Sequence, residues 1–263
     1  MKIKAKKSLG QNFLIDQNII QKIIEVGSIN NNDIILEVGP GTGNLTDYII
    51  KKKPNKIFVI EKDFDLVKIL NEKFRNKITI INEDILNFKI DSLAKEKITI
   101  FGNLPYNIST QILTKWITYQ TKKTTFKKLI LMFQKEVADR ILAKVNTKNY
   151  GRLSIISNWR LNIKKELDIN SQCFYPKPKV NSTLLSFIPK KKFFDIQNPK
   201  NIEYITRIFF NQRRKMIKNP LKLIFKDPDK IAKNLNLNCN LRPQNLSPLT
   251  YFNLTKAYEL LKN

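Results

Sequence analysis

Short hydrophobic runs alternate with amphipathic segments along the first 190 residues of the chain. The runs are rich in isoleucine, which is typical of strands buried inside a parallel sheet. They predict strands at residues 34–38, 57–60, 78–81, 98–101, 129–133, 153–159 and 183–188. This alternation predicts an α/β fold in which helices flank a mostly parallel sheet.

Three hydrophobic stripes with helical spacing lie between the predicted strands. They comprise Ile19, Ile20, Ile23 and Ile24, then Leu66, Val67, Ile69, Leu70 and Phe74, then Ile112, Leu113, Trp116 and Ile117. Asp63 precedes the second stripe and is expected to cap that helix. We interpret the stripes as the core-facing sides of helices and assign them no other role.

The pattern changes after Pro189, where three consecutive lysines open a stretch without strand patterning. Residues 202–210 and 254–261 have helical spacing instead. From residue 189 to residue 263 there are 16 basic and 5 acidic residues, so this part is more basic than the rest. We therefore predict an α/β domain at residues 1–189, with a basic N-terminal segment, and a small all-α basic domain at residues 190–263.

The charge and the hydrophobic pattern of the chain indicate which kinds of protein it can be. Lys and Arg total 48 against 22 acidic residues, and a net charge of +26 attracts polyanions such as nucleic acid. The abundance of Lys, Asn and Ile is also what an A/T-rich genome produces, so part of the charge has that alternative origin. No apolar run approaches the roughly 18 to 20 residues of a membrane span, and residues 1–7 lack the apolar stretch of a secretory signal. We expect a cytoplasmic protein, and a monomer.

Histidine is absent from the chain, and the only cysteines are Cys173 and Cys239. These facts exclude histidine-based triads and most zinc sites. Without a clustered acidic motif, no metal is expected, and both cysteines are interpreted as free structural thiols.

A glycine loop follows the first predicted strand. Its sequence, Gly39-Pro40-Gly41-Thr42-Gly43-Asn44, places glycines where the backbone can turn tightly and approach a ligand. Dinucleotide sites use Gly-x-Gly-x-x-Gly, whereas here Asn44 stands at the position of the third glycine. The loop alone leaves the choice of cofactor open.

Three further polar elements follow the next predicted strands. Glu61 is placed to bind the two ribose hydroxyls of a nucleoside, and Asp84 to accept a hydrogen bond from an adenine amino group. The third element begins at Asn103. Because ligands of open α/β sheets bind at the carboxyl ends of the strands, the four elements together favour S-adenosylmethionine.

The segment from Asn103 to Ser109 suits methylation of an adenine amino group. That nitrogen delocalises its lone pair into the ring, so attack on a methyl donor requires acceptors for its two hydrogens. Asn103 offers a side-chain carbonyl, and Pro105 disfavours helical backbone at Leu104, whose carbonyl can then face the same pocket. Tyr106 offers a face on which a base can stack. The alternative is a strand ending in a proline turn, with Ser109 capping the next helix.

These motifs resemble those of the ribosomal RNA adenine dimethyltransferases, and the resemblance runs nearly end to end. It is carried by residues 8–14 (Ser-Leu-Gly-Gln-Asn-Phe-Leu), 39–43, Glu61, Asp84, 103–106, 174–180 (Phe-Tyr-Pro-Lys-Pro-Lys-Val) and 210–215 (Phe-Asn-Gln-Arg-Arg-Lys). The resemblance implies a Rossmann-like class I S-adenosylmethionine-dependent methyltransferase sheet with a small C-terminal helical domain.

The resemblance also implies roles for individual residues. The cofactor is expected to contact Asn12, Leu14, Gly39, Gly41, Gly43, Glu61, Asp84 and Asn103. Catalysis is expected from Asn103, Leu104, Pro105 and Tyr106, and contact with the base or RNA from Tyr106, Phe174, Arg213, Arg214 and Lys215. Read without the family, the basic triplet is a solvated helix end and Phe174 a packing residue beside a proline turn.

The implied reaction is dimethylation of the N6 amino groups of two adjacent adenines near the 3′ end of small-subunit ribosomal RNA, with a role in small-subunit assembly. The glycine loop and residues 174–180 look more like this small-subunit branch than the antibiotic-resistance enzymes that methylate large-subunit RNA. A non-catalytic ribosome assembly factor and a DNA amino-methyltransferase are further alternatives. An intact glycine loop argues against the former, and a basic helical tail against the latter.

Overall fold

The structure is a computed structural model that describes residues 5–93, 95–118 and 125–261. Its strands are β1 (Phe13–Leu14), β2 (Ile34–Val38), β3 (Lys56–Ile60), β4 (Thr79–Ile81), β5 (Ile98–Gly102), β6 (Phe126–Gln134), β7 (Leu161–Ile169), β8 (Phe174–Tyr175) and β9 (Ser182–Pro189). Its helices are α1 (Gln17–Gly27), α2 (Asn44–Lys51), α3 (Phe64–Phe74), α4 (Ser109–Thr118), α5 (Lys135–Ile141), α6 (Arg152–Arg160), α7 (Pro199–Asn211), α8 (Lys218–Ile224), α9 (Pro228–Asn234) and α10 (Pro248–Leu260).

A seven-stranded sheet in the order β4-β3-β2-β5-β6-β9-β7 organises the first part of the chain. The five strands from β4 to β6 run parallel, and β9 is antiparallel to β6. Strand β2 is the middle one of these five parallel strands, and every residue in it is buried, as expected for a strand covered on both faces. The predicted α/β sheet is therefore confirmed.

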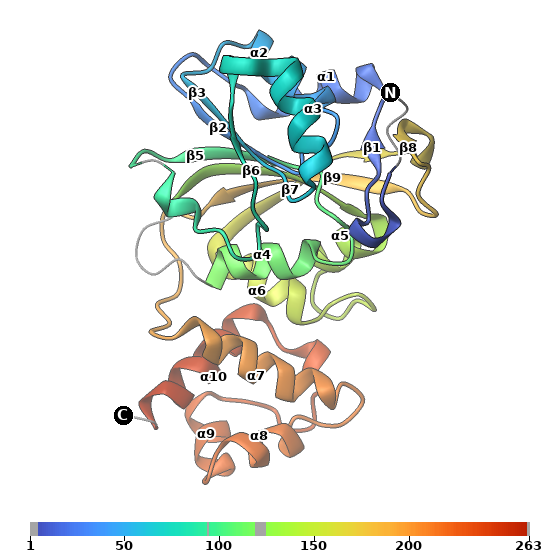
Figure 1. The fold of residues 1–263 in the computed structure, drawn as a ribbon. Helices are drawn as coiled ribbons and strands as arrows, with labels where there is room; N and C mark the ends of the chain where they lie inside the picture. Colours follow the sequence, from blue (N-terminus) through green and yellow to red (C-terminus); the bar gives the residue numbers. More distant parts are fainter. Residues whose placement is uncertain (1–4, 94, 119–124, 262–263) are drawn as a thin grey trace. The chain divides into compact units, whose positions relative to one another are not determined.

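Helices α1, α2 and α3 cover one face of this sheet (Figure 1). Their apolar residues form one core cluster with strand residues such as Ile35, Val59 and Phe101. Asp63 caps α3 as predicted, because its side chain accepts a hydrogen bond from the backbone N–H of Asp65. A separate two-stranded sheet pairs β1 with β8, with Phe13 opposite Tyr175 and Leu14 opposite Phe174.

One strand prediction is wrong: residues 153–159 belong to the helix α6. Alternation of Leu153, Ile155, Ser157 and Trp159 reads as a strand, but most residues of this helix are buried. Because its buried residues include Ser154, Ser157 and Arg160 as well as apolar ones, this helix shows no clear apolar stripe with a 3.6-residue period. The strand lies just after it, in β7, where charged residues concealed the pattern.

Residue contacts divide the chain into two compact units. The first contains the described residues within 1–113, 120–138 and 163–189, and the second those within 114–119, 139–162 and 190–263. The second unit thus includes α6 as well as α7 to α10, whereas the sequence-based division assigned residues 139–162 to the first domain. A domain formed by residues 190–263 alone stays a prediction.

The second unit has an aromatic core of its own. The ring of Tyr251 on α10 packs against Phe209 and Phe210 of α7, with ring centroids 5.5 and 5.8 Å apart. The Tyr251 hydroxyl donates to the carbonyl of Pro243 at 2.7 Å, so this buried polar group has a partner. The described part of this region beyond Pro189 contains only helices, turns and loops, as predicted.

Candidate active site

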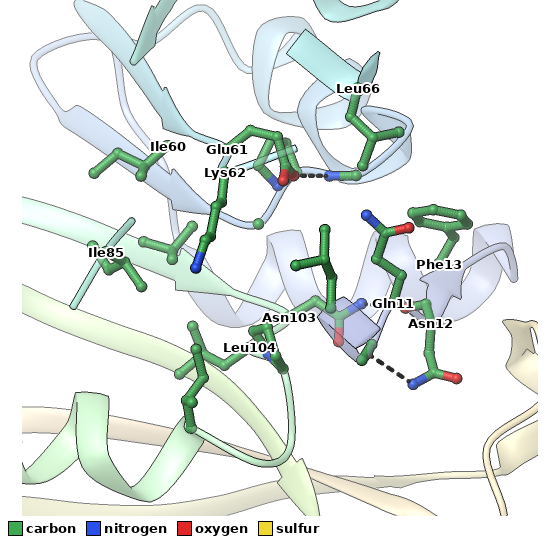
Figure 2. A pocket seen from close by; sticks show the side chains of 18 of the residues that line it. Gln11, Asn12, Phe13, Ile60, Glu61, Lys62, Leu66, Ile85, Asn103 and Leu104 are labelled. Atoms are coloured by element: carbon green, nitrogen blue, oxygen red, sulfur yellow. Dashed lines mark hydrogen bonds between the residues drawn. The ribbon is translucent and has the colours of Figure 1, made fainter. Parts of the chain in front are cut away.

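A cavity of about 270 Å³ lies where the parallel strands β4, β3, β2 and β5 end. The loops that follow these strands line it together with residues 8–14 and Met132 (Figure 2). Parallel strands bring their carboxyl ends to one edge, so segments far apart in sequence converge on one cavity. Of the predicted site residues, Asn12, Leu14, Gly39, Gly41, Glu61, Asp84, Asn103, Leu104, Pro105 and Tyr106 line it.

The glycine loop has a backbone conformation and close contacts that favour glycine. Gly39 and Gly41 have φ angles of 69° and 57°, which L side chains rarely adopt. A Cβ on Gly41 would lie 2.7 Å from the Phe13 ring, and one on Gly39 would lie 3.3 Å from the backbone oxygen of Asn103. The turn therefore favours glycine at both positions, and so does the close approach of the Asn103 backbone at Gly39 and of the Phe13 ring at Gly41.

The Glu61 carboxylate is buried at the end of β3. Its Oε1 accepts the backbone N–H of Asp63 at 2.9 Å, and its Oε2 accepts that of Gly41 at 3.3 Å. Burial raises the pKa of Glu61, and these backbone donors counteract the rise. A carboxylate held from two sides in this way suits a ligand with two adjacent hydroxyl groups.

Asp84 follows β4, and its carboxylate contacts Leu86 and Lys62. Its Oδ1 accepts the N–H of Leu86 at 2.9 Å, and its Oδ2 forms an ion pair with Lys62 Nζ at 2.8 Å. Lys62 also lines the cavity, close to Glu61 in Figure 2.

The Asn103 amide has a defined orientation. Its Nδ2 donates to the backbone oxygen of Asn12 at 2.8 Å. Because that oxygen can only accept, this contact assigns the nitrogen to the Asn12 side and leaves the side-chain oxygen of Asn103 as the remaining acceptor. The geometry thus provides a fixed acceptor at the cavity, as an amino-group substrate requires.

The residues after Asn103 complete this wall. The Leu104 side chain is buried, while Tyr106 is half-buried with its hydroxyl 2.6 Å from Ser182 Oγ. Burial raises the pKa of Tyr106, and the Ser182 contact counteracts it. The Tyr106 ring is thereby held at both ends, by its backbone and by its hydroxyl.

Comparison with known proteins identifies the family of this site. Residues 2–259 match the family described as ribosomal RNA adenine dimethylase. The Ribosomal RNA small subunit methyltransferase A of Pelagibacter ubique (strain HTCC1062) is 55% identical over 262 residues, which cover 100% of both chains. The chain belongs to the ribosomal RNA adenine dimethylase family.

Solved structures agree with this family. A dimethyladenosine transferase from Plasmodium falciparum covers 94% of this chain and 98% of its own, with a TM-score of 0.82 at 27% identity. The 23S rRNA methyltransferase ErmE covers 94% of this chain and 100% of its own, with a TM-score of 0.69 at 21% identity, and this likeness shows the fold alone. The predicted class I S-adenosylmethionine-dependent methyltransferase fold with C-terminal helices is confirmed.

Family membership makes S-adenosylmethionine the cofactor, and the cavity of this dimethylase suits it. Residues 39–42 of the glycine loop line the cavity, so their backbone is within reach of a ligand there. Glu61 and Asp84 both line this cavity, and their contacts with the cofactor stay a prediction. Within the described residues, no group of three or more Cys, Asp or Glu is placed to hold a metal ion.

Phe174 does not line the cavity. Its ring is 2% exposed and belongs to the core cluster, whereas the ring of the next residue, Tyr175, is 61% exposed. Alternation along β8 has this effect, because successive strand residues face opposite sides. A base can reach the Phe174 ring only if this segment moves, so its predicted role in base binding stays a prediction.

Gly43, Arg213, Arg214 and Lys215 are not among the residues that line the cavity. Gly43 is at the start of α2, where a Cβ would lie 2.4 Å from the Phe74 ring, so its glycine is explained by packing. Arg213 donates through Nε to Gln244 Oε1 at 3.1 Å and through Nη2 to the backbone oxygen of Lys148. Arg214 and Lys215 are exposed at the end of α7. Binding of RNA by this triplet stays a prediction.

Several cavity residues were missed by sequence reasoning. Lys62 and Ile85 line the cavity, and each directly follows a residue that was predicted. The missed Glu37, on β2, is 2% exposed and accepts a hydrogen bond from Thr46 Oγ1 at 2.6 Å. Burial raises the pKa of Glu37 to about 7. A carboxylate inside a hydrophobic strand was the signal that could have singled it out.

Proposed function

We propose that this protein transfers methyl groups from S-adenosylmethionine to the N6 amino groups of two adjacent adenines near the 3′ end of small-subunit ribosomal RNA. The full-length relative at 55% identity is a ribosomal RNA small subunit methyltransferase, which supports this substrate. The observation that carries the proposal is the Asn103 amide at the cavity, held by Asn12 with its nitrogen away from the remaining acceptor position.

Each of the predicted cofactor residues would contact a different part of S-adenosylmethionine. When bound, S-adenosylmethionine supplies an electrophilic methyl group and becomes S-adenosylhomocysteine after transfer. Residues 39–42 would contact it through their backbone, Glu61 would accept from the ribose hydroxyls, and Asp84 would accept from the adenine amino group. Asn12 and Leu14 border the same ligand from the N-terminal side. No metal takes part in this proposal.

The target adenine is swung out of its stack and held against Tyr106. The Asn103 side-chain oxygen and the Leu104 carbonyl accept its two amino hydrogens, which localises the lone pair on nitrogen. The methylated nitrogen is acidic enough to release its proton to water, so no histidine is needed. Alignment of this kind contributes roughly 7 to 11 kcal/mol to lowering a barrier. The second methylation has one amino hydrogen fewer to bind.

The basic residues at the end of α7 form the RNA side of the proposal. Arg214 and Lys215 are exposed and suited to phosphate contacts, while Arg213 also holds the loop at Lys148. The substrate is small-subunit RNA or an assembling small subunit, and the enzyme acts as a cytoplasmic monomer. No helix within the described ranges is long and apolar enough to cross a membrane.

Methyl transfer from labelled S-adenosylmethionine tests the proposal directly. Small ribosomal subunits lacking the modification are the substrate, and large-subunit RNA is the parallel control. Label recovered as N6,N6-dimethyladenosine in the small subunit is the expected result. Label in large-subunit RNA alone would assign the protein to the antibiotic-resistance branch. Tight binding to the small subunit without label would instead indicate an assembly factor.

A further inference from the structure

We infer that Lys6, Gln11 and Asp63 are positioning residues for the reaction. They hold residues 6–14, called here the N-terminal strap, against the cavity, and the strap in turn orients the Asn103 amide. This inference rests on the proposed function, since it takes Asn103 as the group that binds the target amino group.

The first attachment of the strap is a buried carboxylate. Asp63 Oδ1 accepts from Lys6 Nζ at 2.6 Å, and its Oδ2 accepts from Gln11 Nε2 at 2.7 Å. Lys6 Nζ also contacts Asp65 Oδ2 at 2.7 Å. The Asp63 side chain is 3% exposed and that of Lys6 is 43% exposed, so an accessible cation binds an inaccessible anion. Burial raises the pKa of Asp63, but the bonds from Lys6 and Gln11 outweigh it, and the pKa lies below its usual value.

The same aspartate also contacts Glu61, the carboxylate proposed to bind the cofactor ribose. The backbone N–H of Asp63 donates to Glu61 Oε1 at 2.9 Å, while its side chain begins α3. One residue therefore joins three features: the strap, the helix and the carboxylate proposed to bind the ribose. We expect displacement of the strap to shift Asp63 and, through its hydrogen bond, the Glu61 carboxylate.

The second attachment lies at the other end of the strap. Leu14 and Phe13 pair with β8, and Asn44 Nδ2 donates to the Leu14 carbonyl at 2.8 Å. The Phe13 ring lies against Gly41, whose missing Cβ makes room for it. With both ends attached, the residues between them have a defined position beside the cavity.

Asn12 lies between the two attachments, and its carbonyl receives the Asn103 Nδ2. A side-chain amide that lost this partner could turn over and present its NH2 group instead of its oxygen. An NH2 group cannot accept an amino hydrogen of adenine. The strap therefore selects the amide orientation that the proposed reaction needs, and Lys6 acts on catalysis without touching the substrate.

Replacement of Lys6 by Met tests this inference, with Lys7→Met as the matched control because it removes the same charge from the neighbouring exposed lysine. Misplacement of a reacting group by about 1 Å can cost about 100-fold in rate. We expect Lys6→Met to lower kcat about 10- to 100-fold at saturating cofactor and RNA. Lys7→Met should leave kcat near wild type, and Lys6→Arg should restore most of it.

Hydrogen exchange supplies a readout that needs no RNA. The amides of Leu9, Gly10 and Gln11 donate to carbonyls within the strap. Their exchange should be slowed by S-adenosylhomocysteine in wild type and in Lys7→Met, and should be fast in Lys6→Met. Absence of methyl transfer by the wild type would defeat the proposed function, while the exchange data would still decide whether Lys6 holds the strap.

A double-mutant cycle separates the ion pair from general effects. Asp63→Asn retains a residue suited to helix capping but removes the negative charge. If Lys6 acts through Asp63, then kcat of the Lys6→Met/Asp63→Asn double variant should match that of the worse single variant. Additive losses, equal losses in Lys6→Met and Lys7→Met, or wild-type kcat and exchange in Lys6→Met would each overturn the inference.

Discussion

At the scale of single residues, the proposed role of Asn103 requires one of the two orientations of its side-chain amide. An amide presents an acceptor on one side and two donors on the other. The Asn12 carbonyl, 91 positions away in sequence, determines which side is available. Asn103 thus supplies the amide group, and the backbone carbonyl of Asn12 decides which side of that amide faces away from it.

Asn103→Ala removes the acceptor and should reduce methyl transfer by at least about 100-fold, as loss of a transition-state hydrogen bond does elsewhere. Asn103→Asp should also be impaired, because a carboxylate cannot donate to the Asn12 carbonyl. Cofactor affinity should change little in Asn103→Ala, since Glu61 and the glycine loop are intact. Single-turnover methylation and titration with S-adenosylhomocysteine measure the two effects. Normal turnover by Asn103→Ala would refute the role of this residue.

At the scale of secondary structure elements, burial explains which predictions succeeded. Strands β2 to β5 appear as hydrophobic runs because helices cover both faces of a parallel sheet. The helix α6 is buried on most sides and was taken for a strand, and the edge strand β7 carries charges and was not recognised. Local periodicity reports a partly exposed face, and it fails where an element has none.

The start of helix α7 depends on a residue from α10. The Glu259 carboxylate accepts the backbone N–H groups of Gln197 and Asn198 at 3.0 and 2.8 Å, and Asn201 Nδ2 at 3.0 Å. Asn198 itself caps α7. Glu259 is buried, so its loss would leave these donors without their acceptor.

Glu259→Ala should therefore lower the free energy of unfolding of the helical unit by about 2 to 3 kcal/mol. Glu259→Gln keeps an acceptor and should lose less. Leu260→Ala, at an exposed neighbouring position, should change it by less than about 0.5 kcal/mol. Both tryptophans, Trp116 and Trp159, belong to this unit, so their fluorescence in urea reports its unfolding. Equal effects of the Ala variants at 259 and 260 would contradict this capping role.

At the scale of the whole molecule, stability depends on carboxylates that the fold places in unlike surroundings. Burial raises the pKa of Glu37 from 4.5 to about 7, and also raises the pKa of Glu61. The pKa values of Asp63, Glu166 and Asp168 are lowered. The stability that these three carboxylates contribute is therefore lost only at more acidic pH. Between about pH 4.5 and 7 the native state retains a proton on Glu37 that the unfolded chain releases.

The stability that Glu37 contributes is thus fully present below about pH 4.5 and is lost as pH rises through about 7. The free energy of unfolding falls by an amount on the order of 3 kcal/mol over this pH range. Glu37→Gln should remove the part of this pH-dependent loss of stability that comes from Glu37 and leave the part that comes from Glu61. Urea unfolding at pH 5 and pH 8, followed by far-ultraviolet circular dichroism, measures it. The exposed Glu25→Gln variant should keep the wild-type difference, and a wild-type difference in Glu37→Gln would contradict the prediction.

Much of the sheet, its helices and the cavity residues at four strand ends could be predicted from the sequence alone. Hydrophobic runs and helical stripes are local patterns, and parallel strands place their carboxyl ends together whatever the remaining details. The family resemblance of the motifs was likewise present in the sequence, and the comparisons confirm it.

Only the tertiary structure decided that Phe174 is buried while Tyr175 is exposed, that Lys6 reaches Asp63, and that Asn12 holds Asn103. Strand alternation specifies that neighbouring residues face opposite sides, but which side is the interior depends on the pairing of β8 with β1. The contacts of Lys6 and Asn103 join residues 57 and 91 positions apart. No local pattern encodes such contacts, because they exist only after the intervening chain has folded.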